Sequence, residues 1–185
     1  MRRVGLGVLL IFAVSWPAQA ETREELAGRI EARTQEISTV PYNGRWVPPG
    51  SASAWTMDCS NTARWLYLAA AGHSLPRTAS DQYEALRAAR RLWRVNATDS
   101  HWRSKLRPGD LLFWENTYRP KRKPPITHVM VYLGRNPDGS MRMAGSQGSR
   151  GVDIYTFRPE TPYGGYTWFL WFKRQGRFVA FGRPL

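Results

Sequence analysis

The sequence has 185 residues, of which 42% are hydrophobic and 13% aromatic, and its formal net charge at pH 7 is +13. A chain this rich in apolar residues can bury a core, so the composition excludes wholesale disorder. The chain contains a single cysteine, which excludes a framework of internal disulfide bonds.

The first 20 residues have the three-part pattern of a secretory signal peptide. Two arginines are followed by an apolar run from Val4 to Val14, and Ala18-Gln19-Ala20 supplies small residues at the spacing of a cleavage site. This run is too short to cross a bilayer, and no later run is longer. We therefore expect residues 1–20 to be removed on export. Residues 21–185 should then form one domain, either periplasmic or secreted.

The next segments are predicted to be a helix and then a loop. Residues 22–37 read as a helix, because Thr22 and Glu25 match a capping box and apolar residues recur at helical spacing. Residues 40–57 are rich in proline, glycine and serine, which is typical of a loop. The aromatic residues of this loop could line a cleft or cover the edge of the core: Tyr42, Trp46 and Trp55.

Two further helices are predicted. One begins at the polar sequence Asp58-Cys59-Ser60-Asn61-Thr62 and stops at Gly72, a residue typical of helix ends. The other starts at Thr78 and continues past Trp93, with apolar residues on one face. Its second face carries arginines at helical spacing: Arg87, Arg90, Arg91 and Arg94.

After residue 110 the pattern changes to short apolar strands separated by turns. Asn136-Pro137-Asp138-Gly139 predicts a hairpin loop, and a second turn is expected at 174–176. Helices first and antiparallel strands afterwards indicate an α+β fold, with the helices packed on a mainly antiparallel sheet. The predicted strands are 111–114, 126–133, 141–144, 152–157, 168–172 and 178–181.

The lone cysteine, Cys59, lies in the polar sequence at a predicted helix start. A single cysteine is more often a small buried hydrophobe than a nucleophile. However, a helix amino terminus presents free N–H groups and the positive end of the dipole, which favour a thiolate. The same amides could stabilise an oxyanion formed on a carbonyl that the sulfur attacks. We therefore favour a nucleophilic role for Cys59.

A thiol nucleophile needs a base, usually histidine, and the sequence has three. His73 follows a predicted helix end, where capping the last carbonyls is its most common role. His101 lies in a polar stretch expected to be a solvated loop. His128 opens an apolar strand, where a polar residue either caps the strand edge or faces a site. His128 is therefore the best partner for Cys59.

At this point the sequence resembles a known family, the NlpC-type cell-wall peptidases, which are papain-like cysteine enzymes that cut peptidoglycan stem peptides. The resemblance rests on several segments that occur in the family's order between about residues 41 and 157. The segments are Pro41-Tyr42, Asp58-Cys59-Ser60, Leu75-Pro76-Arg77-Thr78 with Asp81-Gln82, Leu106 to Phe113, His128 to Gly134, and Gly151-Val152.

This resemblance implies that Cys59 is the nucleophile and His128 the general base and acid. It also implies that Tyr42 approaches the oxyanion region and that Asp58 and Ser60 help to bind substrate. The expected protein is therefore a papain-like cysteine endopeptidase of peptidoglycan.

Two positions depart from the family's pattern. Asn61 stands where the family usually has glycine, and the polar residue that orients the histidine is expected to fall on Met143. Gln147, Ser146, a backbone carbonyl or water could orient the ring instead. Loss of the orienting group typically lowers the rate by orders of magnitude without abolishing it. A weakly active or inactive wall-binding domain, or an amidase or acyltransferase on the same scaffold, are the alternatives.

No Cys-x-x-Cys or His-Glu-x-x-His spacing occurs, so no metal site and no cofactor are expected. The arginine face of the third helix and a basic loop would attract nucleic acid, anionic lipid or another polyanion, or simply be solvated. Export argues against nucleic acid, and peptidoglycan peptides carry free carboxylates. Peptidoglycan stem peptides are therefore the expected partner. The basic loop contains Arg119, Lys121, Arg122 and Lys123.

Overall fold

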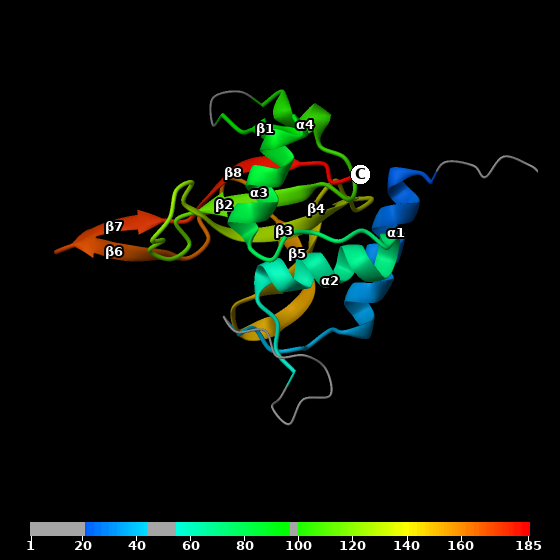
Figure 1. Cartoon of the computed structure of the whole chain (residues 1–185), viewed down its shortest axis with the longest axis horizontal. Helices are drawn as coiled ribbons and strands as arrows, with labels where there is room; N and C mark the ends of the chain where they lie inside the picture. Colours follow the sequence, from blue (N-terminus) through cyan, green and yellow to red (C-terminus); the bar gives the residue numbers. More distant parts are fainter. Residues whose placement is uncertain (1–20, 44–54, 97–99) are drawn as a thin grey trace, which may run out of the picture.

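The computed structural model describes residues 21–43, 55–96 and 100–185. The expected signal peptide and Trp46 lie outside these ranges. The three longest helices pack against one face of an antiparallel sheet (Figure 1), which confirms the α+β prediction. None of the helices in the described ranges has the length and apolar character needed to cross a bilayer. The helices are α1 Arg23–Glu36, α2 Cys59–Ala71, α3 Ala79–Ala88 and α4 Trp102–Lys105.

The main sheet has six strands in the order β1-β8-β2-β3-β4-β5, and β6 and β7 form a separate two-stranded hairpin. Neighbouring strands are antiparallel throughout. Strand β3 lies in the interior of the sheet and is buried along almost its whole length. The strands are β1 Leu92–Arg94, β2 Leu111–Glu115, β3 Ile126–Arg135, β4 Met141–Gln147, β5 Gly151–Phe157, β6 Gly165–Phe169, β7 Phe172–Gln175 and β8 Arg177–Gly182.

Local signals in the sequence explain the ends of α1 and α2. Thr22 and Glu25 form the predicted capping box at the start of α1. Asp58 caps α2 by accepting a hydrogen bond from the Asn61 amide, and Gly72 ends that helix in the left-handed conformation. Cys59 is therefore the first residue of α2, as predicted.

Both faces of the main sheet are covered by apolar side chains. The face toward α1, α2 and α3 packs aliphatic residues of β3, such as Val129 and Val131, against the helices. The opposite face carries a mainly aromatic cluster, which includes Trp114, Tyr132 and Phe157. Because side chains alternate along a strand, His128 projects to this aromatic face, where its ring contacts Trp114.

The third predicted helix is shorter than expected. Helix α3 ends at Ala88, Arg90 takes a left-handed conformation with φ of 57°, and Leu92–Arg94 forms strand β1 against β8. Trp93 stacks on Phe181 with ring centroids 5.3 Å apart, and this contact belongs to the sheet. The prediction of one helical arginine face is therefore wrong.

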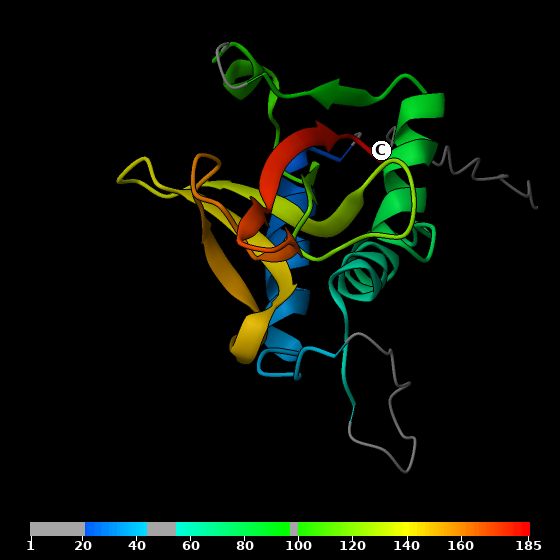
Figure 2. The same cartoon turned by 90° about the vertical axis from the view of Figure 1, so that its left-hand side faces the viewer.

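The strand predicted at 168–172 is also wrong. Residues 165–175 form a hairpin whose turn lies at Leu170-Trp171, in the middle of the predicted strand. Such turns usually contain asparagine or glycine, and here Leu170 adopts a positive φ of 46°. The continuous apolar sequence therefore concealed the turn. The hairpin projects from the body of the protein in Figure 1, and Figure 2 looks at the same side of the molecule from the front.

A buried ion pair links the end of the chain to the turn before β2. The Asp110 side chain is fully buried and accepts hydrogen bonds from Arg183 Nε at 2.8 Å and from the Arg107 amide at 2.9 Å. Burial raises the pKa of Asp110, and Arg183 opposes that rise. The charged form of the Asp110 carboxylate is therefore stabilised by its ion pair with the Arg183 guanidinium.

Replacing Arg183 with methionine is expected to lower the free energy of unfolding by about 3 kcal/mol, because it leaves a buried charge without its partner. Arg33→Met, which removes an exposed pair with Glu36, should have little effect. Urea denaturation at neutral pH measures both. An equal decrease in the free energy of unfolding for the two variants would show that the buried Arg183–Asp110 pair stabilises the fold no more than an exposed pair does.

Candidate active site

The amino end of α2 is held by a small polar network. The Asp58 carboxylate accepts hydrogen bonds from the Asn61 amide at 2.7 Å and from Ser60 Oγ at 2.9 Å. It also pairs with Arg77, whose guanidinium approaches Asp58 Oδ2 to 2.7 Å and Ser60 Oγ to 3.0 Å. This network fixes the first turn of the helix and therefore the backbone of Cys59.

A cleft of about 560 Å³ opens in front of this helix end. Tyr42 reaches it because its backbone bridges to Met57, the residue before Asp58. Four residues that the sequence predicted for the site thus line one cleft. The lining residues are Tyr42, Asp58, Cys59, Ser60, Arg77, Thr78, Ala79, Tyr118, Arg122 and Thr127.

Cys59 lines the cleft, but the residue is only 5% exposed. Burial raises its pKa to about 12, and the nearby Asp58 carboxylate raises it further. Hydrogen bonds from the backbone of Val129 and Ser60 only partly oppose this rise. In the resting structure burial therefore acts against the thiolate that a helix end is expected to favour.

His128 lies next to Val129 on β3, so the backbone that contacts the sulfur also carries the imidazole. Its ring is 2% exposed and is flanked by Trp114 at 5.6 Å and Tyr163 at 4.7 Å between centroids. Burial lowers the pKa of His128 to about 4. Its Nε2 atom is buried and makes no hydrogen bond within the described ranges. His128 is thus a neutral base with an available nitrogen.

Gln147 is the polar side chain beside the His128 ring. Its hydrogen bond raises the pKa of His128 and so opposes the effect of burial. Met143 instead pairs with Tyr132, four residues along β3 from His128, and packs in the aromatic cluster. Placing the orienting position on Met143 was therefore wrong, because strand β4 extends to Gln147.

Ser146, the other candidate to orient the ring, has a different contact. It is fully buried, and its Oγ donates a hydrogen bond to the Met57 carbonyl at 3.1 Å. Met57 leads into Asp58 and Cys59. Ser146 therefore ties β4 to the segment that carries the nucleophile.

Sequence reasoning missed the part of the site that comes from distant loops. Tyr163 packs on His128, and burial raises its pKa to about 12 with a further contribution from Cys59. Tyr118 and Arg122 form part of the cleft and are joined by a hydrogen bond of 3.1 Å. Nothing in the sequence around Tyr163 indicated a contact with His128.

The neutral state of the thiol predicts an unusual labelling profile. Because burial raises the pKa of Cys59 to about 12, alkylation by iodoacetamide should be slow at neutral pH and rise steadily into the alkaline range. Intact-mass spectrometry of the labelled protein gives the rate at each pH. A rate that is already maximal at mildly acidic pH would instead indicate a resting thiolate–imidazolium pair.

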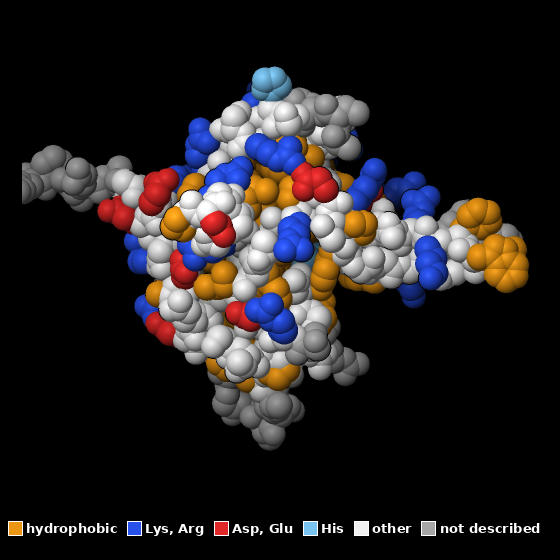
Figure 3. Space-filling model, turned by 180° about the vertical axis from the view of Figure 1, so that it is seen from behind, with side chains coloured by type: hydrophobic (Ala, Val, Ile, Leu, Met, Phe, Trp, Pro, Cys, Tyr) orange, Lys and Arg blue, Asp and Glu red, His pale blue; other side chains and the backbone are white. Residues whose placement is uncertain are grey.

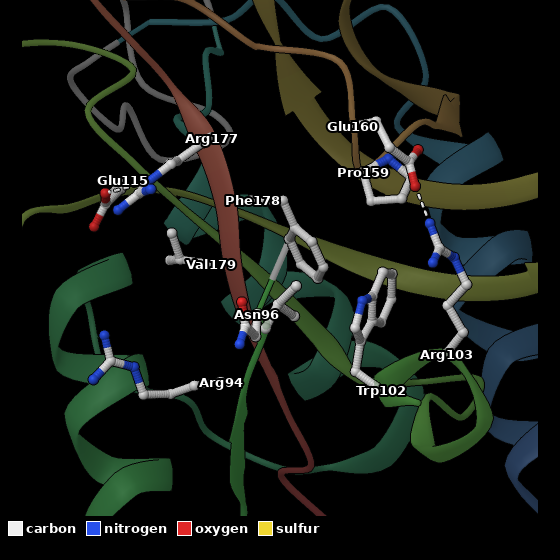
Figure 4. Close-up of a pocket in the computed structure, with 11 residues that line it drawn as sticks. Arg94, Asn96, Trp102, Arg103, Glu115, Pro159, Glu160, Arg177, Phe178 and Val179 are labelled. Carbon is white, nitrogen blue, oxygen red and sulfur yellow. Dashed lines mark hydrogen bonds and ion pairs between the residues drawn. The ribbon is translucent and has the colours of Figure 1, made fainter. Parts of the chain in front are cut away.

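A larger hollow of about 650 Å³ lies on the aromatic side of the sheet. Figure 4 shows Arg103 facing Glu160 and Arg177 facing Glu115 across it, with Trp102 and Phe178 between them. Within the described ranges its lining contains no thiol, whereas Cys59 lines the cleft at the start of α2. The cleft at Cys59 is therefore the better candidate active site.

Comparisons with known proteins show which family this chain is similar to. The model of the NlpC/P60 family matches residues 44–161. Among curated proteins, none matches the chain. A solved structure from Staphylococcus aureus subsp. aureus Mu50, described as similar to a lipoprotein of the NLP/P60 family, shares 26% sequence identity with this chain at a TM-score of 0.48. The match covers 76% of this chain and 39% of the Staphylococcus chain, so this protein spans well under half of that relative.

Proposed function

The chain belongs to the NlpC/P60 family, and we propose from this that it is an exported cysteine hydrolase that cleaves an amide bond in the stem peptides of peptidoglycan. Membership of the family supports a cell-wall peptidase type of function. The observation that carries the finer proposal is the placement of Cys59 at the amino end of α2, in a cleft, beside the strand that bears His128.

In the first half of the proposed reaction, a substrate carbonyl enters the cleft next to Cys59. His128 accepts the thiol proton while the sulfur attacks the carbonyl carbon, so the charged pair forms only during attack. Amides at the start of α2 hold the oxyanion, and Tyr42 approaches it from the cleft wall. The C–N bond then breaks, and the imidazolium gives its proton to the leaving amine. The product of this half is a thioester on Cys59.

In the second half, water attacks the thioester with His128 as base. The tetrahedral intermediate collapses, the C–S bond breaks, and the sulfur regains its proton from His128. The released products are a carboxylate and an amine, and the enzyme returns to its neutral thiol and imidazole.

Charge in the cleft suits a peptide that carries carboxylates. Arg77 and Arg122 both line it, and Asp58 offsets part of the charge of Arg77. Asp58 and Ser60 have their side chains engaged in the network with Arg77. We therefore assign to these two residues the positioning of Arg77 and of the helix end, with direct substrate contact through Arg77.

Gln147 is proposed to hold the His128 ring in position. Gln147→Leu should lower kcat by about tenfold to a hundredfold with little change in KM, because ring orientation matters most during proton transfer. The loss of its hydrogen bond should also shift the acid limb of the pH–rate profile to lower pH, since this bond raises the pKa of His128. Gln35→Leu, at an exposed position of α1, is the matched control. An unchanged profile would contradict the assignment.

Digestion of purified peptidoglycan with wild type and with Cys59→Ser tests the proposed function. Mass spectrometry of the soluble muropeptides should show new amine and carboxylate ends with wild type alone, and the masses identify the bond cut. Identical profiles from the two proteins would refute the hydrolase proposal.

One observation favours a second candidate, a wall-binding domain without catalysis: Cys59 and His128 are both buried, and burial disfavours the charged form of each. In that case wild type and Cys59→Ser would bind peptidoglycan equally and release nothing. An amidase or acyltransferase would differ in the bond cut or in the acceptor, and the same product masses distinguish these reactions.

A further inference from the structure

The β6–β7 hairpin ends in three exposed apolar residues, here called the hairpin tip: Leu170, Trp171 and Phe172. Their exposed fractions are 62%, 83% and 58%. The turn itself is made of Leu170 and Trp171, although a leucine at positive φ is strained and glycine or asparagine is usual there. A bulky apolar turn kept in an unfavourable conformation, with most of its side-chain surface exposed, points to a function for its side chains.

Basic residues lie between the hairpin tip and the body of the protein. Lys173 and Arg174 follow it on β7, and both are exposed. The basic loop that contains Arg119, Lys121 and Lys123 starts beside the root of the hairpin, where the Gly165 amide donates to the Thr117 carbonyl at 2.8 Å. Neither the basic loop nor the chain after Glu160 contains an acidic residue. Figure 3 shows hydrophobic side chains at the end of the hairpin and Lys and Arg side chains behind them.

We propose that the hairpin tip inserts into the surface of an anionic phospholipid bilayer, with these basic residues at the level of the headgroup phosphates. Tryptophan is favoured at the boundary between headgroups and acyl chains, and basic residues are attracted to anionic lipid. An apolar end with cations directly behind it matches that boundary in order and in charge.

The shape of the hairpin favours a bilayer over a protein partner. A stable protein interface covers about 800 Å² on each partner, far more than three side chains at the end of a two-stranded ribbon supply. The tip is also convex and projects away from the main sheet (Figure 1), so it can enter headgroups without a collision between the body and the lipid.

Docking of this kind would fix the orientation of the cleft. The root of the hairpin packs on Thr117, because a Cβ at Gly164 or Gly176 would lie about 3 Å or less from atoms of that residue. Thr117 precedes Tyr118 in the loop that lines the cleft. The cleft is thus held at a set position relative to the tip. The proposal does not depend on the hydrolase reaction, since its test measures lipid binding alone.

The test is sedimentation of the exported protein, without residues 1–20, with vesicles of equimolar phosphatidylglycerol and phosphatidylcholine. Vesicles of phosphatidylcholine alone provide the uncharged comparison. Wild type should bind the anionic vesicles and lose affinity as salt increases. Trp171→Asn and Leu170→Gly should each weaken binding by about tenfold, because each removes an inserted apolar side chain. Lys173→Glu should weaken it by about tenfold and reduce the dependence on salt.

Matched controls separate the tip from general stickiness and from unfolding. Leu68→Asn removes an exposed leucine of α2, and Arg90→Glu reverses an exposed charge at the end of α3, so both should bind like wild type. Leu170→Gly relieves the positive φ and should unfold at the same temperature as wild type or higher.

Two results would overturn the proposal. One is the absence of binding of wild type to anionic vesicles at low salt. The other is unchanged vesicle binding by the folded tip variants, and their loss of binding to lipid-free peptidoglycan would then assign the tip to the cell wall instead.

Discussion

Replacing His128 with glutamine is expected to lower the rate of peptide-amide hydrolysis by about 10⁴-fold, since the variant has no imidazole to take the proton from sulfur and pass it to the leaving amine. Glutamine is neutral and of similar size, so it should fit between Trp114 and Tyr163. Release of muropeptides from peptidoglycan, followed by chromatography over time, measures the loss. His73→Gln, which changes a histidine next to the end of α2, should leave the rate unchanged.

The same variant has an expected effect on stability that shows whether it is folded. Burial lowers the pKa of His128 from 6.5 to about 4, so between these values the unfolded chain binds a proton that the folded protein does not. Wild-type stability should therefore fall as pH decreases from 6.5 toward 4, and His128→Gln should lack this component. Hydrolysis of peptidoglycan at the wild-type rate by folded His128→Gln protein would show that His128 is not the general base.

Replacing Cys59 with serine is expected to lower the rate by at least about 10⁴-fold, because a buried hydroxyl is a far weaker nucleophile than sulfur. The two side chains are similar in size, and the Asp58 network that fixes the helix start does not involve the sulfur. The variant should therefore remain folded and still bind peptidoglycan. Activity assays and sedimentation with insoluble peptidoglycan measure the two properties separately.

The expected pattern for Cys59→Ser is lost turnover with retained binding. Wild type alkylated at its single cysteine provides an independent comparison, since it blocks the same atom without a mutation. Hydrolysis by both inactivated proteins at the wild-type rate would show that another group carries the reaction.

Much of the fold was predictable because helix caps and strand composition depend on residues that are close together in the sequence. The Thr22–Glu25 capping box and the cap formed by Asp58 set the starts of α1 and α2, and Gly72 sets the end of α2. The apolar run of β3 is buried on both faces, as its composition indicates. Because Asp58 starts α2, the position of Cys59 at a helix end followed from the sequence as well.

The failures arose where distant contacts outweigh local preference. Arg90 turns the chain so that Trp93 can stack on Phe181, although the spacing of apolar residues suits a longer helix. The run at 168–172 has strong strand propensity on both sides of a turn that carries no turn residue. In both cases the observed conformation is stabilised by pairing between strands, which the spacing of residues in the sequence does not reveal.

The candidate site likewise contains residues whose placement followed from the nearby sequence and residues placed by distant contacts. Tyr42, Asp58, Cys59 and Ser60 come together through the short-range geometry around the start of α2 and one backbone bridge. Gln147 reaches His128 only through the register of β4 on β3, and Tyr163 only through a loop that returns over the sheet. The raised pKa of Cys59 is a further property of the assembled core, because it depends on burial by residues far along the chain.

The measurement that tests the central claim most directly is detection of the acyl-enzyme. Wild type is mixed with a soluble stem-peptide substrate, quenched in acid during turnover, and examined by intact-protein mass spectrometry with peptide mapping. A covalent thioester on Cys59 should raise the protein mass by that of the acyl part of the peptide, and Cys59→Ser should show no adduct. Hydrolysis by wild type with the acyl group on another residue, or at an undiminished rate in Cys59→Ser, would contradict the claim that Cys59 attacks the amide carbonyl.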